Sequence, residues 1–355
     1  MDKPIISGIQ QMGIGVTDVH EAWKWYRKHL EIDIKVFEEA ATADLMLPYT
    51  AGTPKSRHAI LTLSRAGGGG LEIWQHTDHT PTYPNFQPQL GDLGLFILKI
   101  KCRDINKAFA QFQKAGLELI GQPAADPAGK QHFFLKDPYG NILQLVPATE
   151  FFRKEPVNGG VYGSIIGVSD IEKARTVYSD ILGYDEVVYD EPGIFDDLNG
   201  IPGGKNQVRR VLLRHSQARA GAFSRMLGPT EIELVQATTY QPKKIYEGRL
   251  WGDPGFIHLC FDIVGMDKMR ALCAAKGHPF TIDSETARGG AFDMGEAAGN
   301  FSYIEDPDGT LIEFVETLKV PVAKKLGISV DLRKRDPKKP LPNWMLKAMA
   351  LNRVK

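Results

Sequence analysis

The chain has 355 residues, a formal net charge of zero and an apolar fraction of 43%. These values are ordinary for a globular protein of about two domains, and the neutral charge argues against a polyanion-binding protein. Three cysteines without a CxxC pair indicate reduced thiols rather than a disulfide framework. The chain shows neither a signal-like N-terminus nor an apolar run of about 18 residues. We therefore expect a cytoplasmic protein with no membrane or nucleic-acid partner.

Short motifs recur in the same order along the two halves of the chain. Each pair combines a turn signal or a helix start with an adjacent apolar strand. The matching segments are Gly15 to Asp18 with Gly167 to Asp170, Leu71 to Gln75 with Ile232 to Gln236, Gly91 to Gly94 with Gly252 to Gly255, and Asp137 to Gly140 with Asp306 to Gly309. Four matches at nearly constant offset indicate a duplication.

Each half divides again into two units with the order βαβββ. In every unit a strand leads to an aspartate that can cap a helix, namely Asp18, Asp104, Asp170 and Asp267. The helices are expected at 19–30, 104–115, 171–182 and 266–276, each followed by three strands. The sequence thus predicts an α+β fold made of four modules.

Three regions follow from this pattern. Residues 1–150 and 151–317 are expected to form one domain each, and residues 318–355 a basic tail with a short helix. From Thr317 to Lys355 the chain has eleven Lys or Arg residues and two Asp or Glu residues. The tail could be solvated, could pack against the body or a partner subunit, or could attract anionic substrates.

Paired βαβββ modules with these motifs resemble the vicinal oxygen chelate superfamily, which includes glyoxalases, bleomycin-resistance proteins and extradiol dioxygenases. The resemblance covers about residues 8–317. It implies that modules pair into two half-open β-barrel, glyoxalase-like domains, and that inward side chains of the first and last strands of each module form a ring of four metal-ligand positions.

In the C-terminal half, the ring positions implied by the resemblance are Gly163, Glu233, His258 and Glu313. Two carboxylates and one imidazole suit a divalent ion such as Fe, Ni, Zn, Mn or Co, so we expect Glu233, His258 and Glu313 to bind a metal. The alternative is that the glutamates are salt-bridged strand residues and that His258 is a hydrogen-bonded core histidine.

Other residues of this half are expected near the substrate. Gly163 stands where the family usually has a ligand, so it would leave that corner open. Cys260 shares a strand face with His258, where it could contact the substrate or only pack. Arg288 precedes a glycine-rich link and could meet an anionic group, although a solvated arginine is the simpler interpretation.

In the N-terminal half, the equivalent positions are Gln11, Glu72, Ile97 and Gln144. An isoleucine cannot bind a metal, so this half is expected to be a scaffold, a dimerisation surface or part of the substrate pocket. Gln11 and Glu72 could still hydrogen-bond a ligand.

These features predict a metal-dependent isomerase, epimerase or lyase for a small substrate with vicinal oxygens, working as a possible homodimer. Glu313 or Glu233 would serve as the catalytic base. The alternatives are a non-haem Fe(II) dioxygenase, which would cleave rings or act on a hydroxyphenylpyruvate-like substrate, and a protein that binds a small ligand without catalysis.

Overall fold

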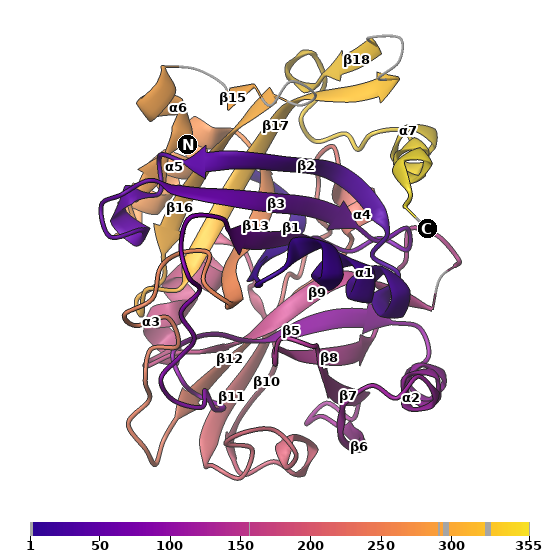
Figure 1. Ribbon diagram of the computed structural model, residues 1–355, viewed down its shortest axis with the longest axis vertical. Helices are drawn as coiled ribbons and strands as arrows, with labels where there is room; N and C mark the ends of the chain where they lie inside the picture. The colour runs from indigo at the N-terminus through magenta and orange to yellow at the C-terminus, as the bar shows by residue number, and fades with distance from the viewer. Residues whose placement is uncertain (1–2, 156, 290–291, 294–297, 324–327, 355) are drawn as a thin grey trace.

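A computed structural model of the chain describes residues 3–155, 157–289, 292–293, 298–323 and 328–354. Its frame is a pair of curled sheets, one above the other in Figure 1. We call the upper, ten-stranded sheet sheet A and the lower, eight-stranded sheet sheet B. The predicted α+β class, with four βαβββ modules forming two half-barrels, is confirmed.

The four modules repeat one order of elements. Module 1 contains β1 (Ile5–Gly15), α1 (Val19–Leu30), β2 (Ile34–Ala43), β3 (Lys55–Leu63) and β4 (Gly70–His76). Module 2 contains β5 (Gly94–Cys102), α2 (Ile105–Lys114), β6 (Leu119–Ala125), β7 (Gln131–Lys136) and β8 (Ile142–Pro147). Module 3 contains β9 (Asn158–Gly167), α3 (Ile171–Arg175) continued by the π-helix η2 (Thr176–Ile181), β10 (Glu186–Gly193), β11 (Val208–Arg214) and β12 (Glu231–Ala237). Module 4 contains β13 (Gly255–Val264), α5 (Met266–Ala275), β14 (Ile282–Asp283), β16 (Ala298–Glu305) and β17 (Leu311–Ala323).

The remaining elements lie in connections and in the tail. They are η1 (Leu47–Tyr49), η3 (Asp196–Leu198), α4 (Ser224–Leu227), α6 (Ser284–Arg288), β15 (Phe292–Asp293), β18 (Ile328–Asp331), η5 (Leu332–Lys334), α7 (Asn343–Ala348) and η6 (Met349–Asn352).

The sheets do not follow the two halves of the sequence. Sheet A combines module 1 with module 4 in the order β14-β16-β17-β13-β1-β4-β3-β2, and sheet B combines modules 2 and 3 in the order β10-β11-β12-β9-β5-β8-β7-β6. The two modules of each sheet join through an antiparallel central pair, β1 with β13 and β9 with β5. The expectation that each half closes a ring of its own is therefore wrong. Each sheet combines one module from each half of the sequence.

Two equivalent linkers carry the chain from one sheet to the other. Residues 77–93 lead from β4 to β5, and residues 238–254 lead from β12 to β13. The linkers contact each other, because Leu93 N donates to Lys243 O at 2.8 Å. A buried aspartate in each accepts a backbone hydrogen bond from the other linker, Asp92 from Lys243 and Asp253 from Thr82. These mutual bonds fix the crossings that bring module 4 beside module 1.

The helix starts agree with the sequence except in module 4. Asp18, Asp104 and Asp170 cap α1, α2 and α3 through their side chains. Asp267 lies inside the first turn of α5, so its predicted capping role is wrong. The Glu316 carboxylate replaces it by accepting from the backbone N–H groups of Gly265, which precedes the helix, and of Met266, its first residue.

The largest apolar core joins strands of both sheets to α1, α2, η2 and α5. Side chains alternate along a strand, so residues between core positions point to the opposite face of their sheet. On sheet B that opposite face carries an apolar cluster that includes Leu198 and Ile201 from the 194–206 loop, beside the buried ion pairs of Glu233. On sheet A it is lined by aromatic residues, among them Trp74, Trp251 and Tyr303.

The basic tail packs against the body of the molecule. β18 pairs with β17, and Leu341 and Leu346 are buried with apolar residues of β2, β3 and the segment around α4. Arg353 then pairs with Asp33 at 2.6 Å. Of the three interpretations of the tail, the structure agrees with the one in which it packs against the body. The expected short helix is α7 with η6.

The helices of the described ranges include none with the length and apolar character that a membrane span requires.

Two equivalent tyrosines hold the turns that precede the last strands of modules 2 and 4. Tyr26 donates to Asp137 at 2.6 Å, and Tyr178 donates to Asp306 at 2.9 Å. All four groups are buried, and burial raises the pKa of both aspartates.

We expect Tyr26→Phe and Tyr178→Phe each to lower the free energy of unfolding by about 1–3 kcal/mol, because a buried carboxylate oxygen loses its donor. Urea unfolding followed by circular dichroism measures this change. Tyr83→Phe is the control, since Tyr83 is 52% exposed. Equal stabilities for all three variants would contradict a structural role for these bonds.

Candidate metal centre

Four polar side chains meet on the aromatic face of sheet A. They are Gln11 on β1, Glu72 on β4, His258 on β13 and Glu313 on β17. Their strand neighbours, such as Met12, Leu71, Leu259 and Ile312, belong to the shared core on the other face. The alternation of each strand therefore turns these four polar side chains toward one another.

The ligand atoms are close enough to share one ion. His258 Nε2 lies 3.3 Å from Glu72 Oε2 and 3.1 Å from Glu313 Oε2. Gln11 Nε2 donates to Glu72 Oε2 at 3.2 Å. Glu72, His258 and Glu313 form one of two clusters of three possible metal ligands among the described residues. All four side chains are at most 13% exposed.

The two carboxylates of this group carry more negative charge than its single imidazole can balance. Two carboxylates around a neutral imidazole leave a local charge of about −2, which a divalent cation would neutralise. Gln11 Oε1 is buried and has no hydrogen-bond partner among the described residues, an arrangement that costs about 1–3 kcal/mol unless a ligand satisfies it. One imidazole, two carboxylates and an amide oxygen thus fit a borderline or hard divalent ion.

Without an ion, the two neighbouring carboxylates determine the pKa of the His258 imidazole. Burial alone would lower the pKa of His258, but Glu313 and Glu72 outweigh it and raise this pKa to about 9. The same interactions with His258 overcome the effect of burial on Glu72 and lower its pKa. A metal ion that binds at neutral pH would therefore have to displace the proton of His258.

Neighbouring residues fix the position of the imidazole ring. Trp251 stacks on His258 at 6.1 Å between ring centroids with an interplanar angle of 15°. The Tyr303 hydroxyl lies 3.5 Å from His258 Nδ1. On the other side the ring covers Gly13, where a Cβ atom would lie only 2.5 Å from His258 Cε1. Only glycine fits at this contact.

Glu233 does not belong to this centre, and this corrects the expected ring. It lies on β12 of sheet B, where Glu233 Oε2 is 2.8 Å from Lys99 Nζ and Glu233 Oε1 is 2.7 Å from Arg210 Nε. Burial alone would raise the pKa of Glu233, but Arg210 and Lys99 hold it well below its usual range. Glu233 is therefore a buried ion-pair residue, as the alternative interpretation held for it.

The ring of sheet B carries its own compensating charges. Its corners are Gly163, Glu233, Ile97 and Gln144. Lys99 also pairs with Glu231 at 2.9 Å, and Arg210 with Asp197 at 2.9 Å.

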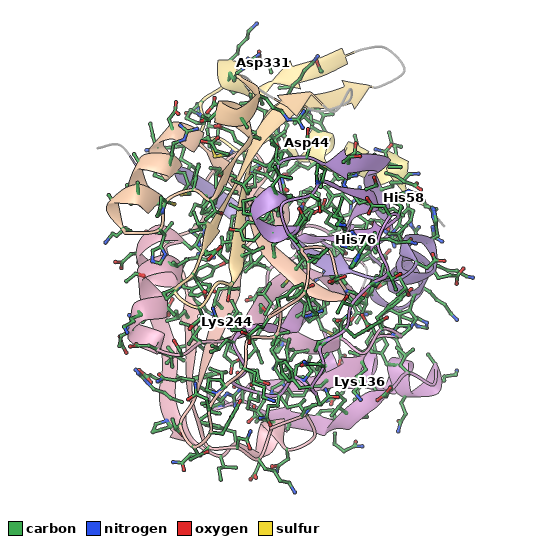
Figure 2. All side chains as sticks on the ribbon, turned by 60° about the vertical axis from the view of Figure 1, so that its left-hand side comes forward. Asp44, His58, His76, Lys136, Lys244 and Asp331 are labelled. Carbon is green, nitrogen blue, oxygen red and sulfur yellow. The ribbon has the colours of Figure 1, made fainter. Side chains whose placement is uncertain are left out.

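The three residues expected near the substrate lie in different places. Gly163 is packed in sheet B, where a Cβ atom would lie 1.8 Å from Glu231 O, so it is not an open corner of the His258 centre. Cys260 is buried beside the centre and is paired in register with Gln11 and Glu313. Arg288 ends α6 and forms an ion pair with Asp44, which Figure 2 labels, at 2.8 Å.

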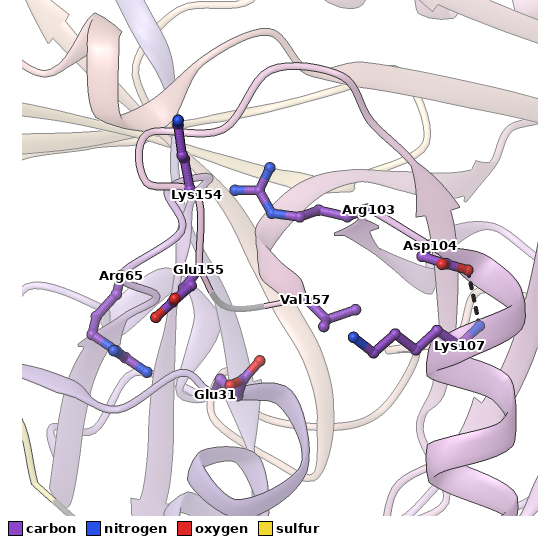
Figure 3. Close-up of a pocket in the computed structure, with 8 residues that line it drawn as sticks. All are labelled: Glu31, Arg65, Arg103, Asp104, Lys107, Lys154, Glu155 and Val157. Atoms are coloured by element: carbon purple, nitrogen blue, oxygen red, sulfur yellow. Dashed lines mark hydrogen bonds between the residues drawn. The ribbon is translucent and has the colours of Figure 1, made fainter.

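A separate open cleft of about 450 Å³ lies away from this centre (Figure 3). It is lined by residues of both charge signs: Glu31, Arg65, Arg103, Asp104, Lys107, Lys154, Glu155 and Val157. None of the four residues of the candidate centre lines it.

Comparison with protein families agrees with the repeat and with the fold. Models of the Glyoxalase/Bleomycin resistance protein/Dioxygenase superfamily match residues 8–145 and residues 165–297. The chain belongs to this superfamily. The matches follow the sequence halves, whereas the two superfamily sheets here are each built from both halves. No curated protein is similar enough in sequence to count as a relative.

Solved structures share the architecture at low sequence identity. Glyoxalase I from Zea mays is 12% identical, with a TM-score of 0.52 over 87% of this chain and 92% of that one. A putative dioxygenase from Bacillus subtilis is 13% identical, with a TM-score of 0.56 over 89% of this chain and 86% of that one. At this identity, the likeness shows the fold alone.

We expect Gly13→Ala to displace the His258 ring and to lower metal content, because the new methyl group cannot coexist with the ring. Elemental analysis after incubation with a divalent metal measures the change. Gly193→Ala is a suitable control, since the nearest atom to its added Cβ lies at 3.6 Å. Equal metal content in both variants would contradict the crowded geometry.

Proposed function

We propose that this chain is a metal-dependent enzyme of the isomerase, epimerase or lyase type, acting on a small substrate with two adjacent oxygen atoms. The observation that carries the proposal is the buried ring of Gln11, Glu72, His258 and Glu313, with its uncompensated charge and its unpaired amide oxygen. All four residues come from one chain, so the centre needs no partner subunit.

The four ring residues would hold the ion. When bound, a divalent ion supplies Lewis acidity that polarises the oxygen atoms of a substrate. Its identity among Fe, Ni, Zn, Mn and Co stays open, because this donor set suits several of them. The aromatic residues around the ring, Trp74, Trp251 and Tyr303, would limit the access of water and favour proton transfer within a shielded site.

We propose Glu313 as the catalytic base. The sequence offered either Glu313 or Glu233, and Glu233 lies outside the centre. Glu72 is held by the Gln11 amide, which donates to Glu72 Oε2. Glu313 Oε2 lies 3.1 Å from His258 Nε2, and no amide among the described residues donates to it. Once His258 binds an ion, Glu313 would therefore be less constrained than Glu72 and could turn toward a substrate carbon. Moving a proton between two adjacent carbons, or eliminating a group beside a carbonyl, requires a general base, and a positioned carboxylate can serve as one.

The number of histidines in the ring bears on whether the protein could be a dioxygenase. The ring holds one imidazole, whereas a facial triad of the non-haem Fe(II) oxygenases uses two histidines and one carboxylate. The ring is therefore better suited to proton transfer than to oxygen activation.

The metal affinity of two variants distinguishes the ring observed in sheet A from the ring expected within the C-terminal half. Glu72→Gln should weaken binding by more than the roughly 10–100-fold that the loss of an outer-shell partner costs. Glu233→Gln, at the equivalent corner of sheet B, should leave the affinity unchanged. Isothermal titration with Mn²⁺ or Zn²⁺ measures both, after circular dichroism has confirmed that each variant is folded. The reverse pattern would refute the assignment.

Proton transfer can be tested with a panel of α-hydroxy ketones in D₂O. The wild-type protein loaded with metal should exchange the hydrogen beside the carbonyl of its preferred compound. Glu313→Gln should slow this exchange by about 10²–10⁴-fold at saturating metal, because the general base is lost. Nuclear magnetic resonance follows the exchange. Oxygen uptake without exchange would indicate a dioxygenase, and binding without either would indicate a non-catalytic protein.

A further inference from the structure

A second cluster of metal-type ligands lies on module 1, outside the centre described above. It consists of His20 at the start of α1, Glu38 on β2 and His58 on β3. One ligand atom of each residue lies within 4.8 Å of those of the other two. The cluster is at the surface, where Figure 2 labels His58, and none of its members takes part in the proposed catalysis.

Three packed elements hold these side chains together. The Trp23 indole, one turn after His20, donates to Ile32 O and to Thr62 Oγ1, so α1 is fixed over β3. His58 and Thr62 lie on the same face of β3, because they are four residues apart in an extended strand. The backbone of α1 thus sets His20 above His58, and their rings meet edge to face at 5.1 Å between centroids.

The carboxylate of Glu38 is oriented toward both imidazoles. Glu38 Oε1 lies 3.3 Å from His58 Nε2 and 3.6 Å from His20 Nε2. Lys35 Nζ occupies the other oxygen, Oε2, at 2.9 Å. A cation at this place would therefore meet one carboxylate oxygen and two imidazole nitrogens, while Lys35 keeps the carboxylate from rotating away.

The separations match those of a small tetrahedral site. Zinc–nitrogen and zinc–oxygen bonds of about 2.0–2.2 Å place tetrahedral donors about 3.3–3.6 Å apart. The two distances to Glu38 Oε1 fall in this range. The side chain of His20 is 61% exposed, so its imidazole can move until its nitrogen lies as close to the imidazole nitrogen of His58 as a tetrahedral site requires.

We propose that His20, Glu38 and His58 bind a second divalent transition-metal ion, of which zinc is the best match. Two imidazoles and one carboxylate favour a borderline ion over magnesium or calcium. The fourth position would hold water or an incoming ligand. The ion would tie the start of α1 to the two outer strands of module 1, the module that also supplies Gln11 and Glu72.

Native mass spectrometry of the full chain without an affinity tag, titrated with Zn²⁺, tests the proposal. The wild type should take up one zinc ion more than the His58→Ala and His20→Ala variants. His29→Ala is the matched control, because His29 is a histidine of the same helix that contacts Trp25 rather than the cluster. It should bind as many ions as the wild type.

A second arm uses a zinc concentration too low to fill the central site once Glu72→Gln has weakened it. In the Glu72→Gln background, zinc should still raise the melting temperature, and adding His58→Ala should abolish the shift. Failure of the central centre alone would leave this shift intact, so the two proposals fail separately. Equal zinc uptake by the wild type and His58→Ala, or a shift that survives in the double variant, would overturn the second site.

Discussion

The antiparallel pairing of β1 with β13 is the constraint on which the candidate centre depends. It sets Gly13 opposite His258 and Gln11 opposite Cys260. The parallel neighbours β4 and β17 then place Glu72 beside Gly13 and Glu313 beside Cys260. Without this one pairing, Gln11 and Glu72 of module 1 would lie in a different sheet from His258 and Glu313 of module 4. The two crossing linkers maintain it, because each holds the other through a buried aspartate.

The two rings of the duplicated fold solve the same electrostatic problem in different ways. In sheet B the negative charges of Glu231, Glu233 and Asp197 meet the positive charges of Lys99, Arg210 and Arg214. Such a network is costly to bury but internally balanced. In sheet A the carboxylates have only one imidazole between them. A bound ion in sheet A would supply the charge that Lys99 and Arg210 supply in sheet B.

Much of this arrangement could be predicted from the sequence, but the partnership of the modules could not. The resemblance to the superfamily, mapped through the repeat, gave all eight ring positions and predicted that His258 and Glu313 share one site. It assigned Glu72 and Glu233 to the wrong rings, because the central strands of all four modules are similarly apolar and their pattern does not specify which modules pair. The distribution of possible ligands was a signal for the correct pairing. Module 1 has a glutamine and a glutamate at its ring positions, and module 4 has a histidine and a glutamate, so these two modules together supply four polar side chains.

Other differences also arose from interactions between distant residues. Asp267 stands where a capping aspartate is expected, yet Glu316 from the neighbouring strand takes over its role. His258 needs the bare backbone of Gly13, and nothing in the sequence around position 13 indicates that contact. Local patterns thus predicted the elements well, whereas the contacts that make a site depend on the crossing of the chain.

The central claim is that modules 1 and 4 build one metal centre. Anomalous X-ray diffraction from crystals grown with Mn²⁺ or Zn²⁺ tests it most directly. A peak bounded by His258 Nε2, the carboxylates of Glu72 and Glu313 and the Gln11 amide oxygen is the expected result. A peak at Glu233, or none within sheet A under conditions in which the protein retains metal, would contradict the account.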